Sequence, residues 1–420
     1  MSLTDRTARA RPQMANRVGG GGPAAGRDDL RLFLVAGEHS GDTLGAKLMA
    51  AINARCKGRV HYLGVGGEGM EQEGLASQFP LADVAVMGLL SILPRLPRII
   101  ARVRRTAAAA VAAEPDAIVI IDAPEFTHAI AKRVRKRAPQ IPIIDYVSPS
   151  VWAWRPGRAA KMRAYVDHVM ALLPFEPGAH ARLGGPPCTY VGHPLVEQLD
   201  ALNALDPWPL ADRLQLDPHR LVLVVLPGSR TNEVTRLMEP FGRALDILHE
   251  RRIRPQVIIP VVPAVRALVE RQMQSWIVKP HLVEGNDDKF RAFKLAHAAL
   301  AASGTVTLEL ALAGTPMVVA YRADALTARL RFLIKAQSVV LANLVLGENA
   351  FPEYLQEECT PDNLADALDT LLRDTPERQA QLEALARIPE KLVRDGGTPS
   401  DFAAEIVLDY AAHGRRRPAV

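Results

Sequence analysis

An apolar run that meets a glycine-containing turn and then a helical pattern is the feature that most constrains the fold of this chain. It is clearest where residues 298–302 end at the turn 303–305 and residues 317–321 follow as a further apolar run. Buried strands that alternate with helices in this way predict an α/β fold with parallel sheets. The other runs that fit strands of this kind are residues 30–36, 60–65, 117–122, 141–147 and 221–226.

The turn at 303–305 also predicts an anion site. Ser303 is a good N-cap, because its hydroxyl can accept a hydrogen bond from an unpaired N–H group of the next helix. Gly304 lets a ligand approach the backbone, and Thr305 leads into the positive end of the helix dipole. Glu309, in the second turn, can accept bonds from hydroxyl groups beside that anion. These features describe a nucleoside diphosphate; the alternative is a well-capped strand–helix–strand unit with Glu309 in solvent.

A second turn of this type follows residues 221–226, before a helix that we expect to begin at about Glu233. The main-chain N–H groups at Gly228 and Ser229 and the charge of Arg230 suit a phosphate group. Asn343, in a turn-rich stretch further along the chain, is a weaker candidate near the same nucleotide. The second half of the chain therefore offers two anion-holding turns.

Composition describes an ordinary globular protein. The 420 residues predict two or three domains, and the net charge of +5 is a modest bias towards anionic partners. Aromatic residues, at 5%, are too few to favour the stacking platforms of a single-stranded nucleic-acid site. Three scattered cysteines and the lack of a DxD-type cluster predict neither disulfides nor a metal cofactor. No apolar run approaches the roughly 18 residues that span a bilayer.

The first half of the chain offers carboxylates and a shaped loop. Residues 117–122 predict a buried strand that ends at Asp122, on the sheet edge where ligands of open α/β folds bind. The alternative for Asp122 is that it caps the following turn. A loop at 148–158 contains two tryptophans and an arginine, which indicates a pocket wall rather than a simple connection. Taken with the two turns, this arrangement favours transfer of a group from a nucleoside diphosphate to an acceptor held opposite.

Residues 81–100 combine an apolar cluster with a run of arginines that begins at Arg95. Such a surface can lie among lipid headgroups, with its arginines on lipid phosphates. The alternative is a core helix with a solvated basic end. The apolar candidates for a membrane or acyl-chain contact are Val84, Val86, Met87, Leu89, Leu90 and Leu93.

The expected domain boundaries follow from composition. Residues 1–28 predict a disordered N-terminal extension. Three prolines at 207, 209 and 218 predict a linker over residues 201–219. An N-terminal domain then occupies residues 29–200 and a C-terminal domain residues 220–390. A last helix and a basic tail occupy residues 391–420.

Six motifs resemble those of lipid-A-disaccharide synthases, a late segment at residues 343–356 is similar too, and the whole resemblance runs from about residue 30 to about residue 408. The loop at 148–158 and the turn after residue 121 carry the most specific part of this resemblance. Glu125 and Thr127 depart from the family pattern, where we expect Asp and Asn. The motifs are Gly37-Glu38-His39-Ser40-Gly41-Asp42, Asp122-Ala123-Pro124, Ser148-Pro149-Ser150-Val151-Trp152-Ala153-Trp154-Arg155, Gly192-His193-Pro194, Leu226-Pro227-Gly228-Ser229-Arg230 and Ser303-Gly304-Thr305-Val306-Thr307-Leu308-Glu309.

The resemblance implies a GT-B fold, in which two Rossmann-like domains face each other and the C-terminal helix crosses back to the first. It implies a metal-independent, inverting hexosyltransferase of lipid A biosynthesis. The expected donor is UDP-2,3-diacylglucosamine and the expected acceptor is 2,3-diacylglucosamine 1-phosphate. The product is the β-1,6-linked disaccharide 1-phosphate. The resemblance also implies a peripheral location on the phospholipid surface of the inner membrane, at its cytoplasmic face, with no nucleic-acid partner, and it leaves a homodimer open.

Residue roles follow from the same resemblance. Asp122 is the expected general base, with His39 and Glu38 as alternatives. Glu309 is the expected ribose contact, and Asn343 a further contact near the nucleotide. The expected diphosphate contacts are Ser229, Arg230, Ser303, Gly304 and Thr305. The cations expected to hold the 1-phosphate of the acceptor, or else to lie in solvent, are Arg155, Lys161 and Arg163.

Two rival functions remain open on the sequence. The first is a UDP-sugar 2-epimerase on the same fold, which needs no lipid-binding surface. The second is a non-enzymatic basic protein that binds membranes or nucleic acid, favoured by the net charge and the arginine runs. The second rival leaves the two anion-holding turns without a purpose.

Overall fold

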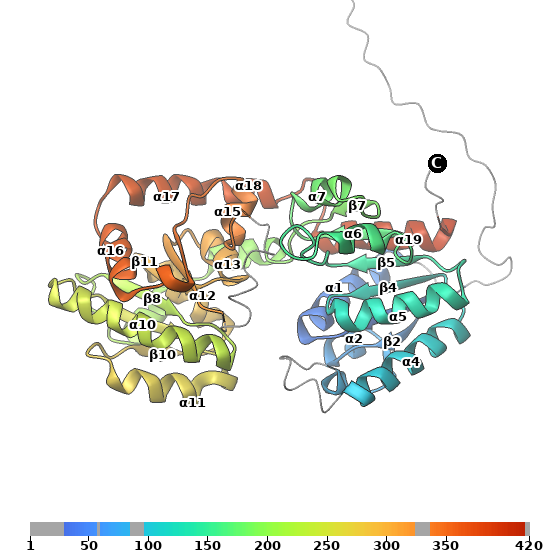
Figure 1. The fold of residues 1–420 in the computed structure, drawn as a ribbon, viewed down its shortest axis with the longest axis horizontal. Coiled ribbons are helices and arrows are strands. Elements are labelled where there is room, and N and C mark those ends of the chain that lie inside the picture. Colours follow the sequence, from blue (N-terminus) through green and yellow to red (C-terminus); the bar gives the residue numbers. More distant parts are fainter. Residues whose placement is uncertain (1–28, 57–58, 85–95, 324–336, 416–420) are drawn as a thin grey trace, which may run out of the picture.

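Two parallel sheets, one in each domain, organise the chain (Figure 1). The structure is a computed structural model that describes residues 29–56, 59–84, 96–323 and 337–415. The expected N-terminal extension, residues 1–28, lies outside the described residues. All pairs of neighbouring strands run parallel, so the predicted α/β class is confirmed.

The first sheet has the strand order β3-β2-β1-β4-β5-β6-β7. Its central strands are buried, because apolar runs in a parallel sheet are covered by helices on both faces. The strands are β1 (Leu30–Ala36), β2 (Val60–Val65), β3 (Ala76–Ser77), β4 (Ala117–Ile121), β5 (Ile143–Tyr146), β6 (His168–Ala171) and β7 (Cys188–Tyr190). The helices around it are α1 (His39–Arg55), α2 (Glu68–Gln72), α4 (Leu96–Ala112), α5 (Pro124–Arg137), α6 (Gly157–Met162) and α7 (Glu176–Arg182).

The second sheet has the strand order β10-β9-β8-β11-β12-β13. Its strands are β8 (Val222–Leu226), β9 (Gln256–Pro260), β10 (His281–Val283), β11 (Ala298–Ala302), β12 (Met317–Tyr321) and β13 (Glu353–Leu355). Its helices are α10 (Thr231–Glu250), α11 (Pro263–Gln272), α12 (Asn286–Leu295), α13 (Val306–Leu312), α15 (Leu341–Leu346), α16 (Pro361–Leu372), α17 (Pro376–Ala386) and α18 (Ile388–Leu392). Strand β8 lies between β9 and β11, so the chain reverses its direction of travel across the sheet at this strand.

The connection between the sheets contains two short helices, α8 (Leu199–Ala204) and α9 (Trp208–Arg213). Their residues Leu202 and Leu210 are buried in the same core cluster as strands β8 and β11. Within the stretch expected to be a linker, these helices therefore pack on the second domain.

The C-terminal helix α19 (Pro399–His413) returns to the first domain and packs along α1 (Figure 1). Ala403, Val407 and Tyr410 are buried there against Leu48 and Ile52. The predicted crossing of the last helix is thus confirmed, and so is its cap, because the Thr398 hydroxyl accepts a hydrogen bond from the Asp401 N–H at 3.1 Å. This packing ties α19 to the first domain.

Candidate functional site

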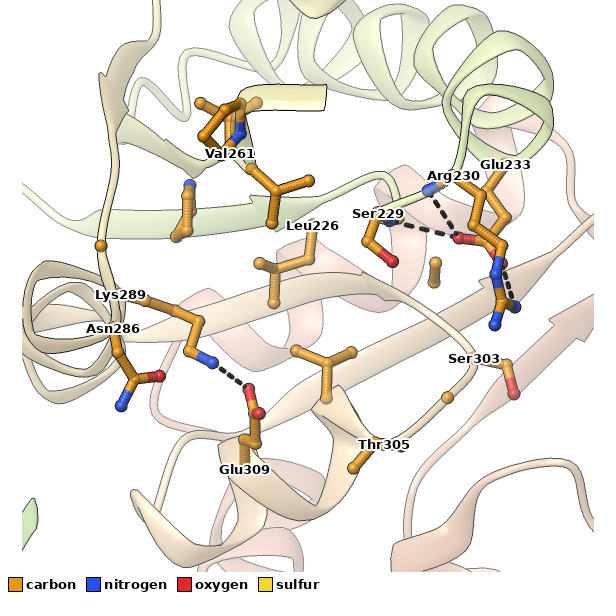
Figure 2. Close-up of a pocket in the computed structure, with 18 residues that line it drawn as sticks. Leu226, Ser229, Arg230, Glu233, Val261, Asn286, Lys289, Ser303, Thr305 and Glu309 are labelled. Atoms are coloured by element: carbon orange, nitrogen blue, oxygen red, sulfur yellow. Dashed lines mark hydrogen bonds and ion pairs between the residues drawn. The ribbon is translucent and has the colours of Figure 1, made fainter. Parts of the chain in front are cut away.

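A pocket of about 530 Å³ lies at the carboxyl ends of β8, β9 and β11 (Figure 2). This is the edge at which open parallel sheets bind ligands, and β8 is the strand where the sheet order reverses. The volume is in the range of pockets that hold small molecules. Its polar lining comes from three strand ends and the first turns of the helices that follow them, and it consists of Ser229, Arg230, Glu233, Asn286, Lys289, Ser303, Thr305 and Glu309.

The turn after β8 forms one wall of this pocket. Gly228 adopts φ +111°, and a Cβ atom there would lie 2.5 Å from Glu233 Oε2, so the turn requires glycine. Helix α10 begins at Thr231, two residues before the expected Glu233, with Arg230 as its N-cap. Glu233 Oε2 accepts hydrogen bonds from the N–H groups of Ser229 and Arg230 at 3.2 and 3.3 Å. The Ser229 N–H, one of the two N–H groups expected to hold phosphate, and the neighbouring Arg230 N–H therefore already have an acceptor.

The turn after β11 forms the opposite wall, and it differs from the expectation. Helix α13 begins at Val306, and its N-cap is Thr305 without a side-chain cap, so the prediction of Ser303 as the N-cap is wrong. The Ser303 hydroxyl instead donates to the Val339 carbonyl at 2.7 Å. It is drawn there because the segment before α15 passes beside the turn. Ser303, Gly304 and Thr305 nevertheless all line the pocket, as expected for ligand contacts.

Glu309 lies in the pocket together with a cation that the sequence analysis did not single out. The Lys289 ammonium group, on α12, is 2.8 Å from Glu309 Oε2 (Figure 2). Both side chains are largely covered, so the ion pair is less weakened by water than a surface pair. Lys289 thus fixes the position of the Glu309 carboxylate beside the pocket.

Asp122 lies at the carboxyl end of β4, in the first domain. Its Oδ2 accepts a hydrogen bond from the Ser40 hydroxyl at 2.9 Å, and its Oδ1 accepts one from the Ala123 N–H at 2.8 Å. Asp122 and Ala123 have φ of +53° and +44°, a conformation that costs non-glycine residues about 1–2 kcal/mol each. Gly37 makes the arrangement possible, because a Cβ atom there would lie 2.4 Å from that of Ala123.

Glu38 links the carboxylates of the first domain to the pocket of the second. Burial raises the pKa of the Glu38 carboxyl, the charge of Asp122 raises it further, and the charge of Arg230 lowers it. Arg230 belongs to the second domain, so a residue that lines the pocket contributes to the electrostatic environment of Glu38. Asp122, Glu38 and the exposed His39 do not line the pocket itself.

The basic residues expected on the acceptor side are exposed. The Arg155 guanidinium lies over the Trp154 ring, 5.3 Å from its centroid. Lys161 is on α6, and Arg163 is the residue that ends this helix. The loop before them is anchored to α7, because the Trp152 indole N–H donates to Glu176 Oε1 at 3.1 Å. The structure therefore presents these cations at the surface beside a loop with a buried anchor.

Asn343 does not line the pocket. It is buried in α15, where its amide nitrogen donates to the Phe351 carbonyl and its oxygen accepts from the Phe351 N–H, both at 2.9 Å. These contacts close the turn-rich stretch that follows α15. The structure thus gives Asn343 a structural contact, and its expected contact with a nucleotide stays a prediction.

The predicted membrane contact is only partly described. Val84 is buried in the core cluster of the first domain, so it is not an exposed apolar contact. Val86, Met87, Leu89, Leu90 and Leu93 lie outside the described residues. Directly after them, α4 exposes Leu96 and Ile100, while Arg102 pairs with Asp83 at 2.5 Å. Among the helices that the structure describes, none has the length and apolar character needed to cross a membrane.

The sequence did not show which groups Asp42, Lys289 and Glu233 contact. Asp42 is buried and accepts hydrogen bonds from the N–H groups of Gly67, Gly69 and Met70, so it holds the turn after β2. Lys289 lies on a helix with no local signal. Glu233 had one available signal, since its spacing of three from Arg230 fits a capping box, although Arg is an unusual N-cap.

Over the described ranges, no group of three or more His, Cys, Asp or Glu side chains is placed to hold a metal ion.

Solved structures share the fold of this chain at low sequence identity. A UDP-GlcNAc 2-epimerase from Neisseria meningitidis, bound to UDP-GlcNAc, matches with a TM-score of 0.62 and 12% identity, over 90% of this chain and 99% of that one. MurG from Acinetobacter baumannii matches with a TM-score of 0.55 and 12% identity, over 90% and 99%. With its two parallel-sheet domains, the chain has the GT-B fold, as predicted.

Sequence comparisons then specify the family. The family model described as lipid-A-disaccharide synthetase matches residues 32–397. A lipid-A-disaccharide synthase of Rhodopseudomonas palustris (strain HaA2) is 52% identical over 90% of this chain and 96% of its own length. One from Bradyrhizobium diazoefficiens is 50% identical over 93% and 99%. The chain belongs to the lipid-A-disaccharide synthetase family, so the predicted resemblance is confirmed.

Proposed function

We propose that this chain transfers 2,3-diacylglucosamine from its UDP derivative to 2,3-diacylglucosamine 1-phosphate, with inversion, to give the β-1,6-linked lipid A disaccharide 1-phosphate and UDP. The observation that carries the proposal is the family match over residues 32–397. The pocket at the carboxyl ends of β8, β9 and β11 supports it, because its two turns suit a nucleoside diphosphate.

The donor is proposed to bind in the second domain. The Arg230 guanidinium and the turn at Ser303–Thr305 lie on facing walls of the pocket, where they can take the two phosphates. Glu309, held by Lys289, accepts hydrogen bonds from the ribose hydroxyls. The negative charge that develops on the departing diphosphate is then met by a cation and by main-chain dipoles.

Asp122 is proposed as the general base. The hydrogen bonds from Ser40 and Ala123 fix the carboxylate, and each of its oxygens keeps a further lone pair for the acceptor 6-hydroxyl. As the hydroxyl oxygen forms its bond to the anomeric carbon, its proton passes to Asp122. The bond from that carbon to the diphosphate breaks, and UDP leaves with the electron pair. Attack from the face opposite the leaving group inverts the anomeric centre.

Two further parts of the proposal concern the setting of the reaction. Transfer needs no metal ion, since Arg230 and the turns take the charge that a cation would otherwise neutralise. The enzyme acts as a peripheral protein at the cytoplasmic face of the inner membrane, where both diacylated substrates reside. The exposed Leu96 and Ile100 on α4, with the nearby Arg98, support a contact with an anionic lipid surface.

The test is incubation of the pure protein with both substrates in mixed micelles containing EDTA, followed by mass spectrometry. The expected products are the disaccharide 1-phosphate and UDP in equal amounts. A UDP-sugar 2-epimerase would act on the donor alone, without need of the lipid acceptor. UDP release that does not depend on the acceptor, or activity that EDTA abolishes, would contradict the corresponding part of the proposal.

A further inference from the structure

The carboxylate of Glu233 occupies the phosphate-binding turn of the second domain (Figure 2). Its Oε2 accepts from the N–H groups of Ser229 and Arg230, and its Oε1 lies 3.3 Å from the Arg230 guanidinium. Carboxylate and phosphate oxygens accept hydrogen bonds from the same donors. Glu233 therefore contacts a set of groups that a diphosphate at this turn would contact.

We propose that Glu233 competes with the diphosphate of the donor for these three groups, and thereby weakens nucleotide binding and favours the release of UDP. The inference rests on the proposed function, because it assigns an affinity-setting residue to the same donor site. Glu233 acts through Arg230 and the turn, so it is a positioning residue rather than a catalytic one.

The geometry of the turn favours such an exchange. The N···O distances of 3.2 and 3.3 Å are longer than the usual distance of about 2.9 Å, so the bonds to Glu233 are weak ones. The Arg230 side chain is 60% exposed, which leaves it free to turn from Glu233 towards a ligand. Gly228 has no Cβ atom in the way, so the Glu233 carboxylate can fold onto the turn.

The charge of Glu233 cannot move far from the pocket. Its backbone is fixed in the first turn of α10, and its side chain is only 13% exposed. A carboxylate within several ångströms of a diphosphate repels it. The carboxylate also offsets part of the positive potential of the helix N-terminus, which would otherwise attract the diphosphate. Removal of this charge should therefore tighten UDP binding by about tenfold.

The alternative is that Glu233 only caps α10 and fixes the turn. The two possibilities differ in sign, because loss of a cap lowers stability and leaves a looser phosphate site. Glu233→Gln is the informative variant, since its amide oxygen can accept the same hydrogen bonds while the charge is lost. We would titrate UDP into the full-length wild type and E233Q by calorimetry, at low and high salt, and measure KM and kcat for the donor.

Competition predicts that E233Q binds UDP about tenfold more tightly, with a lower KM for the donor and no gain in kcat. Glu233→Ala is a second test. This variant loses the helix cap, so its melting temperature should fall, but competition predicts that it still binds UDP more tightly than the wild type. Glu239→Gln is the matched control, an exposed residue on the same helix with the same change in charge, and it should leave UDP affinity unchanged.

Equal or weaker UDP binding by folded E233Q and E233A overturns the inference and leaves Glu233 as a helix cap. A wild-type protein that does not bind UDP at all would instead count against the proposed donor site. The two failures are therefore distinguishable in one set of titrations.

Discussion

At the scale of single residues, Asp122 accepts two hydrogen bonds from its own domain, one on each oxygen. Such bonds fix the orientation of the carboxylate. They also explain why Ser40 and Gly37 belong to the same motif, since the first donates to Asp122 and the second makes room for Ala123. The motif is thus a support for one carboxylate.

Asp122→Asn tests the proposed base. The amide keeps the size of the side chain but cannot take a proton, so turnover should fall by about a hundredfold or more. The KM for the donor should change little, because Asp122 does not line the donor pocket. Steady-state assays with both substrates measure this. Turnover close to that of the wild type would move the base to another group, with Glu38 the nearest candidate.

Arg230→Ala tests the proposed role of the pocket in binding the donor. Loss of the guanidinium removes a charge-assisted contact, so UDP affinity should fall by about tenfold or more. Calorimetric titration of UDP measures the change. Arg243→Ala, an exposed arginine further along the same helix, is the control and should bind UDP like the wild type. Unchanged affinity in R230A would remove Arg230 from the set of diphosphate contacts.

At the scale of elements, a buried carboxyl anchors the loop that follows β5. Glu176, in the first turn of α7, accepts hydrogen bonds from the Trp152 indole and from the Leu173 N–H. Burial raises the pKa of Glu176 to about 7, against hydrogen bonds that lower it. The Trp152 ring packs edge-on against Phe175, beside the core of the second domain. The anchor therefore lies where the two domains meet.

This anchor predicts a pH dependence of stability. A carboxyl whose pKa is higher in the folded than in the unfolded state binds its proton more tightly when folded. Stability therefore falls as the pH rises from about 4.5 to about 7, by on the order of 3 kcal/mol from Glu176 alone. Glu176→Gln removes this titration, so its unfolding midpoint should fall less between pH 5 and pH 8.

Denaturant unfolding at pH 5, 6, 7 and 8 measures the difference between wild type and E176Q. Glu377→Gln changes an exposed carboxyl on another helix and should keep the pH profile of the wild type. Parallel profiles for wild type and E176Q would show that Glu176 stays charged in the folded protein.

At the scale of the whole molecule, α19 joins the segment that follows the second domain to the first domain. Its buried face packs on α1, and Ser400 donates to Glu197 from its hydroxyl at 2.6 Å. Glu197 in turn pairs with Lys47 of α1 at 2.7 Å. The Tyr190 hydroxyl also donates to the Leu392 carbonyl at 2.7 Å. These contacts bind the segment that leaves the second domain to the sheet of the first.

Val407→Ala tests this packing. Val407 is fully buried, so the substitution leaves a cavity against α1 and should destabilise the first domain by about 1–3 kcal/mol. Chemical denaturation followed by circular dichroism measures the change. Glu405→Ala alters an exposed residue of the same helix and should stay within about 0.5 kcal/mol of the wild type. Equal stability of both variants would mean that α19 contributes little to the first domain.

Much of the fold was predictable because its signals are local. A short apolar run such as 117–121 predicts a buried strand by itself. Thr398 caps α19 through its own side chain, three residues from the N–H group that it binds. The pocket residues at 229–230 and 303–305 were predictable for the same reason, since a glycine-containing turn after an apolar run is recognisable in the sequence. Ser303 was wrongly predicted as an N-cap because the competing acceptor, the Val339 carbonyl, lies 36 residues away in the chain.

The sequence by itself determined the α/β class, the family and the turns of the pocket in the second domain, since each depends on neighbouring residues or on motifs. Only the tertiary structure decided which side chains meet: Lys289 pairs with Glu309, and Ser40 donates to Asp122. It also decided that the charge of Arg230 lowers the pKa of Glu38. It also placed Val84 in the core and Asn343 within its own turn. The physical reason is that contacts between distant segments depend on how helices and sheets pack, and no local pattern records that packing.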